Sequence, residues 1–257
     1  MENREFYIDH DGIALHAKLD FPGKESTSGK YPLVIVVHGF TGHMEERHIA
    51  GLAAALNDAG FASLRVEMYG HGKSGGSFRT HTVAKWLSEL LTVINYAAGL
   101  DFVTNLYMAG HSQGGLATIL TAGMNADRLK AVVPLSPAVS ICYDSRRGNS
   151  LGGLFDPEHI PDEVVFPDGK VLSGDYFRIA QMLPVDEAIK RYKGPVLIVH
   201  GDEDEAVPLH FSEEVIGEFA NARLKVIHGD DHCYDHHLDL VLKEVTEFLL
   251  ACEAGEI

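Results

Sequence analysis

The sequence predicts an α/β protein with a mostly parallel β-sheet of about eight strands and helices on both faces. Short runs rich in β-branched residues alternate along the chain with longer segments typical of helices. Several runs are apolar throughout, as strands buried on both faces should be, and the clearest are LVIVV at 33–37 and VLIV at 196–199. The same pattern continues from end to end, so we expect a single domain over 1–257.

The expected elements follow in a regular order. Segment 4–21 alternates polar and apolar residues around the turn dipeptide Asp11-Gly12, which predicts an antiparallel hairpin on the sheet edge. Further strands are expected near 33–37, 61–66, 105–109, 131–135, 196–199 and 222–227. Helices are expected near 45–59, 81–99, 114–124, 210–220 and 237–252.

One segment, 136–194, breaks this order. It carries Pro, Gly, Asp and Arg without sustained periodicity and is far longer than an ordinary connection between a strand and a helix. The sheet pattern resumes after it. We therefore expect a lid or cap inserted within one domain.

Composition and charge exclude several classes of function. The 257 residues are 46% hydrophobic and 23% charged, which is typical of a globular protein and not of a disordered or fibrous one. The net charge of −16 disfavours nucleic acid and anionic membrane surfaces as partners. The first twenty residues contain no apolar run of the kind found in signal peptides or membrane anchors.

The cysteines bear on the compartment. There are three, far apart and in no CxxC pair, so they favour neither a disulfide framework nor a thiolate metal site. We expect a cytoplasmic protein. The sequence leaves the oligomeric state open, a homodimer included.

The segment GHSQG at 110–114 fits the pattern G-x-S-x-G. The run NLYMA before it is typical of a strand, and the run GLATILTAGM after it is typical of a helix. A nucleophile elbow needs this strand, turn and helix, and its glycines make room for the sharp turn. Ser112 is therefore the candidate nucleophile.

Serine needs a base and an acid to become a strong nucleophile. Carboxylates follow the strand VLIVHG, at the edge of the sheet where α/β proteins place their sites. We choose Asp204, because the Val-Pro that follows favours a fixed loop before a helix. Asp202, closer to the end of the strand, is its rival.

His232 is the candidate base. It lies in the middle of the loop HGDDH, between the last expected strand and the final helix. His228 would still lie on or beside the strand, while His236 and His237 would begin the helix. The order Ser112, acid, His232 is the order found in α/β hydrolases.

An acyl-transfer site also needs backbone N–H groups directed at the oxyanion of the tetrahedral intermediate. We expect one from Gln113, directly after the nucleophile. The other should come from the loop HGFTG at 38–42, after the strand 33–37, where we choose the N–H of Phe40.

The segments HGFTG, YGHGKSGG, GHSQGG, HGDEDEAVP and GDDHCYDHH occur in the order and spacing of serine α/β hydrolases, which the chain resembles over nearly its whole length. Within the insert, HIPD at 159–162 and RIAQMLP at 178–184 resemble bacterial cinnamoyl (feruloyl) esterases, which cleave esters of hydroxycinnamic acids. The resemblance implies an α/β-hydrolase fold and hydrolysis of hydroxycinnamoyl esters through an acyl-enzyme, with no cofactor. The alternatives are a generalist short-chain carboxylesterase, a monoacylglycerol lipase and a ligand receptor with slow turnover.

A phenolic acyl group needs an apolar slot for its ring and a polar partner for its hydroxyl. In the insert, Asp144 is our candidate acceptor for the phenol. Tyr143 and Tyr176 are candidate ring walls, and Leu154 and Phe155 are candidate apolar lining.

Two competing motifs are weaker. GHGKS at 70–74 resembles a phosphate-binding loop, but Glu67 stands where that motif needs its first glycine. His232 and His236 have the spacing of a metal pair, with Asp235 and Asp239 nearby, yet the spacing needs a helix that continues through Gly229. We therefore expect no metal site.

Overall fold

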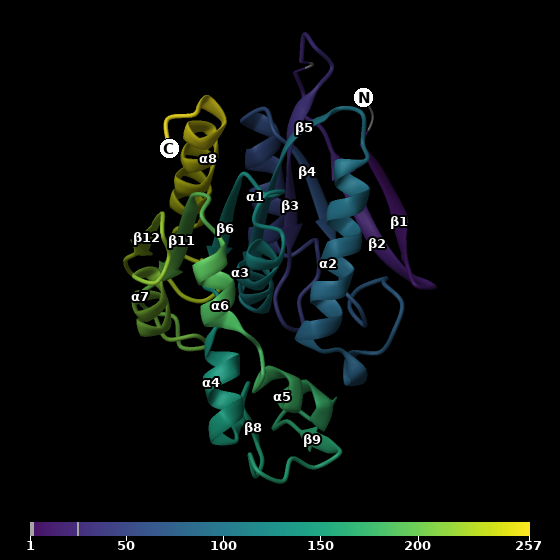
Figure 1. Ribbon diagram of the computed structural model, residues 1–257, viewed down its shortest axis with the longest axis vertical. Helices are drawn as coiled ribbons and strands as arrows, with labels where there is room; N and C mark the ends of the chain where they lie inside the picture. Colours follow the sequence, from purple (N-terminus) through teal and green to yellow (C-terminus); the bar gives the residue numbers. More distant parts are fainter. Residues whose placement is uncertain (1–2, 25) are drawn as a thin grey trace.

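The computed structural model describes residues 3–24 and 26–257. It contains an eight-stranded sheet in the order β1-β2-β4-β3-β5-β6-β11-β12, which confirms the predicted fold class (Figure 1). The strands of this sheet are β1 Arg4–His10, β2 Ile13–Asp20, β3 Tyr31–Val37, β4 Ala62–Val66, β5 Val103–His111, β6 Ala131–Leu135, β11 Val196–Gly201 and β12 Ala222–Ile227. From β4 to β12 neighbouring strands are parallel. The functional loops after β3, β5 and β11 therefore leave the sheet at the same edge.

The edge hairpin predicted for 4–21 is β1 and β2, which pair antiparallel from Arg4↔Leu19 to His10↔Ile13. Asp11 and Gly12 both have positive φ, 50° and 82°. Two such residues form the turn whose twist matches a two-residue hairpin.

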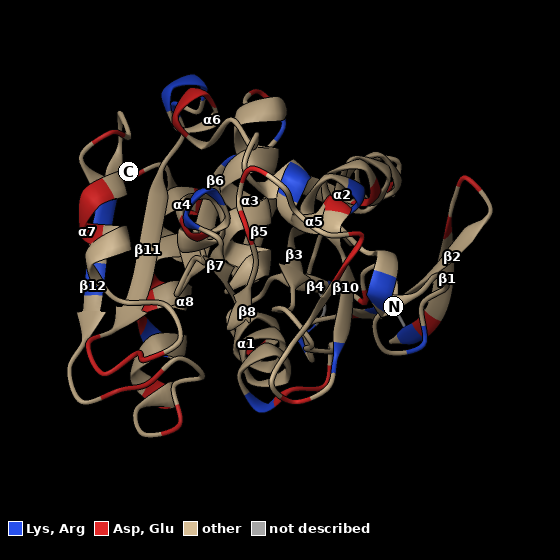
Figure 2. Ribbon diagram, turned by 90° about the horizontal axis from the view of Figure 1, so that it is seen from below, with Lys and Arg blue, Asp and Glu red and all other residues tan. Residues whose placement is uncertain are grey.

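Helices cover both faces of the sheet (Figure 2). Along β3, Leu33, Ile35 and Val37 belong to one apolar cluster, with α2 Val83–Ala98 and α3 Gln113–Met124. Val34 and Val36 belong to the other, with α1 Arg47–Asp58 and α8 Leu238–Ala254. Successive side chains of a strand point to opposite faces, so a run apolar throughout is explained by burial on both sides.

The segment 136–194, expected as a lid, divides into two parts. Residues 140–180, here called the cap, lie beyond the carboxyl edge of the sheet (Figure 1). The cap contains α4 Ser140–Arg147, β7 Asn149–Ser150, β8 Gly153–Leu154, β9 Glu163–Val165, β10 Val171–Ser173 and α5 Gly174–Ala180. The helix α6, Val185–Arg191, instead packs on α3, where a Cβ on Gly123 would stand 2.4 Å from Ala188 Cα. It belongs to the helical layer on the sheet.

Two further short helices lie outside the cap. These are the 3-10 helix η1 Phe78–Thr80, just before α2, and α7 His210–Ile216, between β11 and β12. None of the helices in the described residues combines the length and apolar character that a membrane crossing needs.

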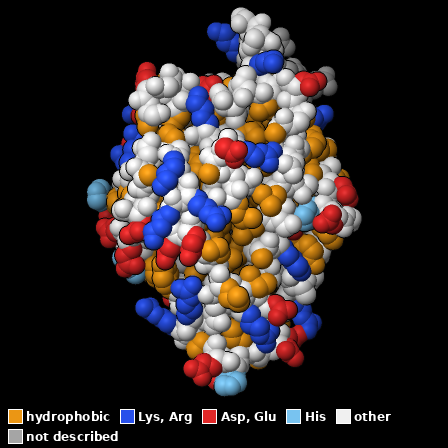
Figure 3. All heavy atoms as spheres, in the orientation of Figure 1, with side chains coloured by type: hydrophobic (Ala, Val, Ile, Leu, Met, Phe, Trp, Pro, Cys, Tyr) orange, Lys and Arg blue, Asp and Glu red, His pale blue; other side chains and the backbone are white. Residues whose placement is uncertain are grey.

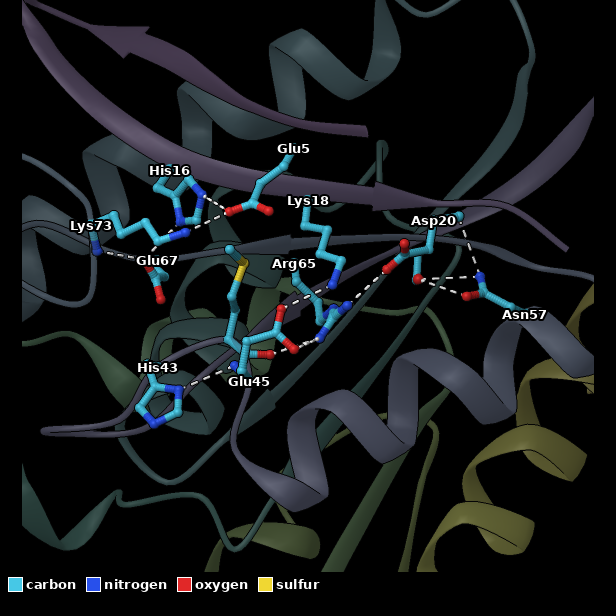
Figure 4. A network of polar contacts seen from close by, with 12 residues as sticks. Glu5, His16, Lys18, Asp20, His43, Glu45, Asn57, Arg65, Glu67 and Lys73 are labelled. Carbon is cyan, nitrogen blue, oxygen red and sulfur yellow. Dashed lines mark hydrogen bonds and ion pairs between the residues drawn. The ribbon is translucent and has the colours of Figure 1, made fainter. Parts of the chain in front are cut away.

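A polar network fastens the hairpin to the sheet (Figure 4). The guanidinium of buried Arg65 on β4 donates to Asp20 Oδ2 at 2.8 Å and to Glu45 Oε2 at 3.1 Å. Next to it, Glu67 Oε2 accepts from His16 Nδ1 at 2.8 Å. Buried charges with several partners avoid the cost of an unpaired charge, so the network fixes where the chain leaves β4.

Charged side chains of both signs are interspersed on the surface in Figure 3, with apolar side chains exposed among them. Three large apolar side chains of high exposure lie on the cap or just after it: Leu154 at 76%, Val165 at 64% and Met182 at 81%. The cap is thus the less completely buried part of the molecule.

Candidate active site

Ser112 lies at the turn between β5 and α3, as the elbow pattern predicts. Its φ of 56° and ψ of −118° are strained for a residue with a side chain. A Cβ on Gly110 would stand 2.3 Å from Gly114 O, and one on Gly114 would stand 2.4 Å from His38 O. A side chain at Gly110 would therefore push β5 away from α3, and one at Gly114 would push α3 away from the end of β3, which explains both glycines.

The loop after β3 comes up against this turn. A Cβ on Gly39 would lie 3.1 Å from the Cβ of Ser112. Gly39 therefore contacts the candidate nucleophile, and Phe40 is the next residue of the loop. Within residues 3–24 and 26–257, the N–H groups of Phe40 and Gln113 donate no hydrogen bond to other backbone groups. Two unused donors beside a serine are the arrangement that an oxyanion hole requires.

Asp204 is buried in the loop after β11, with 7% of its surface exposed. Its Oδ1 accepts from the N–H groups of Ala206 and Val207 at 2.9 and 2.8 Å, and its Oδ2 accepts from His232 Nδ1 at 2.7 Å. A second histidine, His200 Nε2, stands 3.2 Å from the same Oδ2. Three hydrogen bonds thus fix the carboxylate, and His200, whose Nε2 also lies 2.8 Å from Val207 O, stands close beside it.

These contacts also set its charge. Burial by itself would raise the pKa of Asp204, but the close contacts with His200 and His232 outweigh it and hold the pKa well below its ordinary value. Asp204 is therefore ionised at neutral pH. It holds a proton on Nδ1 of His232, which leaves Nε2 free to accept one when the ring is neutral.

The loop that carries His232 is fastened from two sides. The buried carboxylate of Asp230 accepts from the N–H groups of His236 and His237, each at 3.1 Å. His111, next to the candidate nucleophile, donates from Nε2 to the backbone oxygen of His232 at 2.7 Å. Through His111, the serine turn and the histidine loop are directly linked.

The ring of His111 is enclosed. It packs against His48 of α1, with ring centroids 4.3 Å apart. Burial lowers the pKa of His111 well below its ordinary value and lowers the pKa of His48 to about 4. Both imidazoles are therefore neutral at pH 7 and add no positive charge beside His232.

The structure separates Asp204 from its rival. Asp202 accepts from His228 Nδ1 and from the Gly229 N–H, both at 2.7 Å, in an exposed turn. The side chain of His228 is 85% exposed. This pair lies apart from His232, so the geometry brings Asp204 and not Asp202 to the site.

A pocket of about 410 Å³ opens beside Phe40 and the residues that follow Asp204, and neither Ser112 nor His232 is among the residues that line it. Phe40 and Val207 line it from the sheet edge, and Asp144 and Leu151 line it from the cap. Burial raises the pKa of Asp144, while Arg147 and His210 oppose that rise. The volume is within the range of small-molecule sites. We call this cavity the acyl pocket.

The four side chains expected as walls and lining of an acyl site are not among the residues that line this pocket. Tyr143 lines another cavity and stacks on Phe211, and Leu154 points to solvent. Phe155 packs on Phe177 with ring centroids 4.4 Å apart. Tyr176 is fully buried and donates to Gln113 Oε1 at 2.6 Å. The inserted segment needs an apolar centre of its own, and its aromatic side chains provide most of it.

The competing motifs can be placed as well. The loop of GHGKS at 70–74 folds over Glu67, whose Oε2 accepts from the Lys73 N–H at 2.6 Å, so this N–H is not available to a phosphate. α8 begins at Leu238, after both His232 and His236. Among the described residues, no three His, Cys, Asp or Glu side chains are grouped to hold a metal ion.

Sequence reasoning missed three supporting residues: His111, His200 and Asp230. Each is polar, fully or almost fully buried, and next to a candidate catalytic segment. The only signal in the sequence was a polar side chain at the end of an apolar strand or inside the motif itself. Their partners lie on other loops and therefore required the fold.

Comparisons with known proteins identify the family to which the chain belongs. A family model described as serine aminopeptidase, S33, matches residues 30–155, which include Phe40 and Ser112. The structure of Est1E from Butyrivibrio proteoclasticus with ferulic acid bound has 53% sequence identity and a TM-score of 0.94, covering 97% of this chain and 99% of its own.

Curated relatives are more distant. A monoacylglycerol lipase from Mycolicibacterium smegmatis is 24% identical over 251 residues, covering 85% of this chain and 88% of that protein. Protein ABHD12B from Homo sapiens is 26% identical over 204 residues, and the match covers 74% of this chain but 51% of that protein, so the chain spans about half of its length. With the fold, the elbow and a match to Est1E over nearly the full length, the chain belongs to the serine α/β-hydrolase superfamily.

Proposed function

We propose that this protein is a serine esterase that hydrolyses hydroxycinnamoyl esters of the feruloyl type. The observation that carries the proposal is the 53% identity to a structure that holds ferulic acid, over 97% of this chain. The acyl pocket supports it, because Phe40, Ile141, Leu151 and Val207 offer apolar contacts in the same cavity as the carboxyl of Asp144.

The reaction is assigned to the residues as follows. Ser112 Oγ attacks the ester carbonyl while His232 Nε2 takes its proton, and the N–H groups of Phe40 and Gln113 stabilise the oxyanion. His232 returns the proton to the leaving alcohol, and an acyl-enzyme remains. Water, activated by the same imidazole, then releases the acid and frees Ser112. Asp204 orients His232 and stabilises its charged form.

We propose that Asp144 accepts a hydrogen bond from the 4-hydroxyl of the phenolic ring. It lies on α4 of the cap, partly buried, and lines the acyl pocket together with Phe40. A phenol inside an apolar slot needs such a partner, since an unpaired polar group costs about 1–3 kcal/mol. We further propose that 1–257 functions as one domain, with the cap as the lid of this pocket.

A panel of esters tests the proposal. We expect the highest kcat/KM for methyl ferulate, compared with p-nitrophenyl butyrate and a monoacylglycerol, with turnover in the ordinary range of about 1–10³ per second. The highest value for the monoacylglycerol would assign a lipase instead, and the relative from Mycolicibacterium smegmatis is the reason to include it. A few turnovers per hour with tight binding would assign a receptor.

We also propose a cytoplasmic location. Cys142, Cys233 and Cys252 are free thiols, which suits a reducing compartment. Fractionation of the source cells measures it, and the mass of the native protein by light scattering measures whether a homodimer forms.

A further inference from the structure

A second cavity lies between the edge hairpin, α2 and the cap. Its volume is about 660 Å³, larger than that of the acyl pocket and within the range of small-molecule sites. It shares no lining residue with the acyl pocket. The hairpin contributes Ile13, α2 contributes Ala84 and Glu89, and α5 contributes Ile179. In Figure 1 the hairpin and α2 lie on the right, and α5 lies below them.

Glu89 is the unusual residue of this cavity. Only 1% of its surface is exposed. Its Oε2 accepts from the Tyr69 N–H at 3.0 Å, whereas its Oε1 makes no hydrogen bond within residues 3–24 and 26–257. This unpaired oxygen belongs to a residue that lines the cavity, so it is available to a hydrogen-bond donor there. A ligand could supply the hydrogen bond that Oε1 lacks.

The other lining groups narrow the chemistry of the ligand. Ile13, Ala84 and Ile179 offer apolar contacts. The ammonium of Lys85 lies 4.3 Å from the centre of the Tyr69 ring, so the wall carries a positive charge that opposes a cationic ligand. Asp11 and Asp175 carry negative charge at the same cavity and oppose an anion. Arg178 pairs with Asp175 at 2.9 Å and offsets its charge, so the wall carries charges of both signs and we infer a neutral ligand.

We propose that this cavity is a second binding site, for neutral small molecules that combine an apolar body with a hydroxyl group paired to Glu89 Oε1. A hydroxyl group suits this position because it can donate to a carboxylate or accept from a carboxylic acid. Burial raises the pKa of Glu89 to about 7, so both forms are present near neutral pH. The site does not depend on the proposed esterase activity.

The test uses three probes with one apolar body: cyclohexylmethanol, cyclohexylmethylamine and cyclohexanecarboxylate. Calorimetric titration of the intact protein at pH 7 should show binding of the alcohol, with at least about tenfold weaker binding of the amine and the acid. The alcohol should also raise the melting temperature, because it binds the folded state. No binding of the alcohol up to about 10 mM, or equal binding of all three probes, would overturn the proposal.

Two tryptophan variants locate the site. Ala84→Trp, at an exposed position of α2 that lines the cavity, should fill it and weaken binding of the alcohol at least about tenfold. Ala54→Trp, at an exposed position of α1 outside the cavity, is the matched control and should bind as wild type does. Unchanged binding to Ala84→Trp contradicts the site.

A third variant separates this proposal from the proposed function. Asp144→Ala changes the acyl pocket alone and should leave binding of cyclohexylmethanol unchanged. If Asp144→Ala abolishes binding, the alcohol occupies the acyl pocket, and the second site is wrong while the esterase proposal stands. If the ester panel fails and the alcohol still binds in the manner described, the esterase proposal is wrong and the second site stands.

Discussion

The carboxyl edge of the sheet and the cap hold their side chains in different ways. At the edge, backbone groups fix Ser112 and Asp204: two glycines make room for the serine turn, and two N–H groups bind the carboxylate. In the cap, aromatic side chains such as Phe155 and Phe177 pack on one another, and Leu154 stays 76% exposed. The edge is therefore suited to a fixed reaction geometry, and the cap to variation in what the acyl pocket accepts.

The largest effect should come from the edge. Ser112→Ala should leave a folded protein whose kcat for ester hydrolysis falls by about 10⁴ to 10⁶, because the nucleophile is lost while the rest of the site remains. Steady-state kinetics measures this, with circular dichroism to establish folding. Activity within about tenfold of wild type in a folded variant would remove Ser112 from the mechanism.

The next effect is on stability in acid, and it should come from histidines outside the cap. Burial lowers the pKa of His38 and His81 to about 3 and that of His48 to about 4. Below about pH 6.5 the unfolded chain binds protons that these folded-state histidines do not, so stability is present above that pH and is lost as pH falls. Between pH 7 and pH 5 each of the three should cost about 2 kcal/mol of unfolding free energy. His111 adds to this loss, whereas Glu89, whose pKa is raised to about 7, offsets part of it by binding a proton in the folded state.

Urea unfolding at the two pH values measures that loss. His81→Asn should reduce it by about 2 kcal/mol if the variant keeps its fold at pH 7, because one buried histidine is removed from the proton balance. The cap has a single histidine, His159, with a side chain 81% exposed, and His159→Asn is the matched control. If His81→Asn loses as much stability between pH 7 and pH 5 as the wild type does, His81 is not held neutral by burial.

The cap should affect substrate choice more than the reaction itself. Asp144→Ala should lower kcat/KM for methyl ferulate by about tenfold to a hundredfold, equivalent to about 1.4–2.8 kcal/mol, and should spare p-nitrophenyl butyrate. Asp162→Ala, another cap aspartate whose side chain is fully exposed, is the control and should change neither. Equal losses on both esters would make Asp144 a structural residue, and no loss would place the phenol elsewhere.

The smallest effect concerns the contact between the two regions. Tyr176→Phe removes the donor to Gln113 Oε1 and should lower the free energy of unfolding by about 1–2 kcal/mol, because a buried acceptor loses its partner. Leu154→Ala, at an exposed position of the same cap, should change it by less than about 0.5 kcal/mol. If thermal or urea unfolding ranks the two variants in the opposite order, the contact through Tyr176 does not couple the cap to the edge.

By itself the sequence determined the sheet and its edge. An apolar strand buried on both faces, a glycine pair around a serine and a turn dipeptide such as Asp11-Gly12 are local patterns with one low-energy backbone solution, so they can be recognised without the fold. The positions of Ser112, Asp204 and His232 at that edge followed from the order of strands and loops.

Only the tertiary structure decided which polar groups meet and which aromatic side chains face a pocket. The choice of Asp204 over Asp202 depends on two neighbouring loops, and so do the roles of His111 and His200. In the cap, Tyr176 and Phe155 have the composition of a ring-binding wall yet pack inside, because a side chain's direction in an irregular insertion is set by long-range packing and not by a local period.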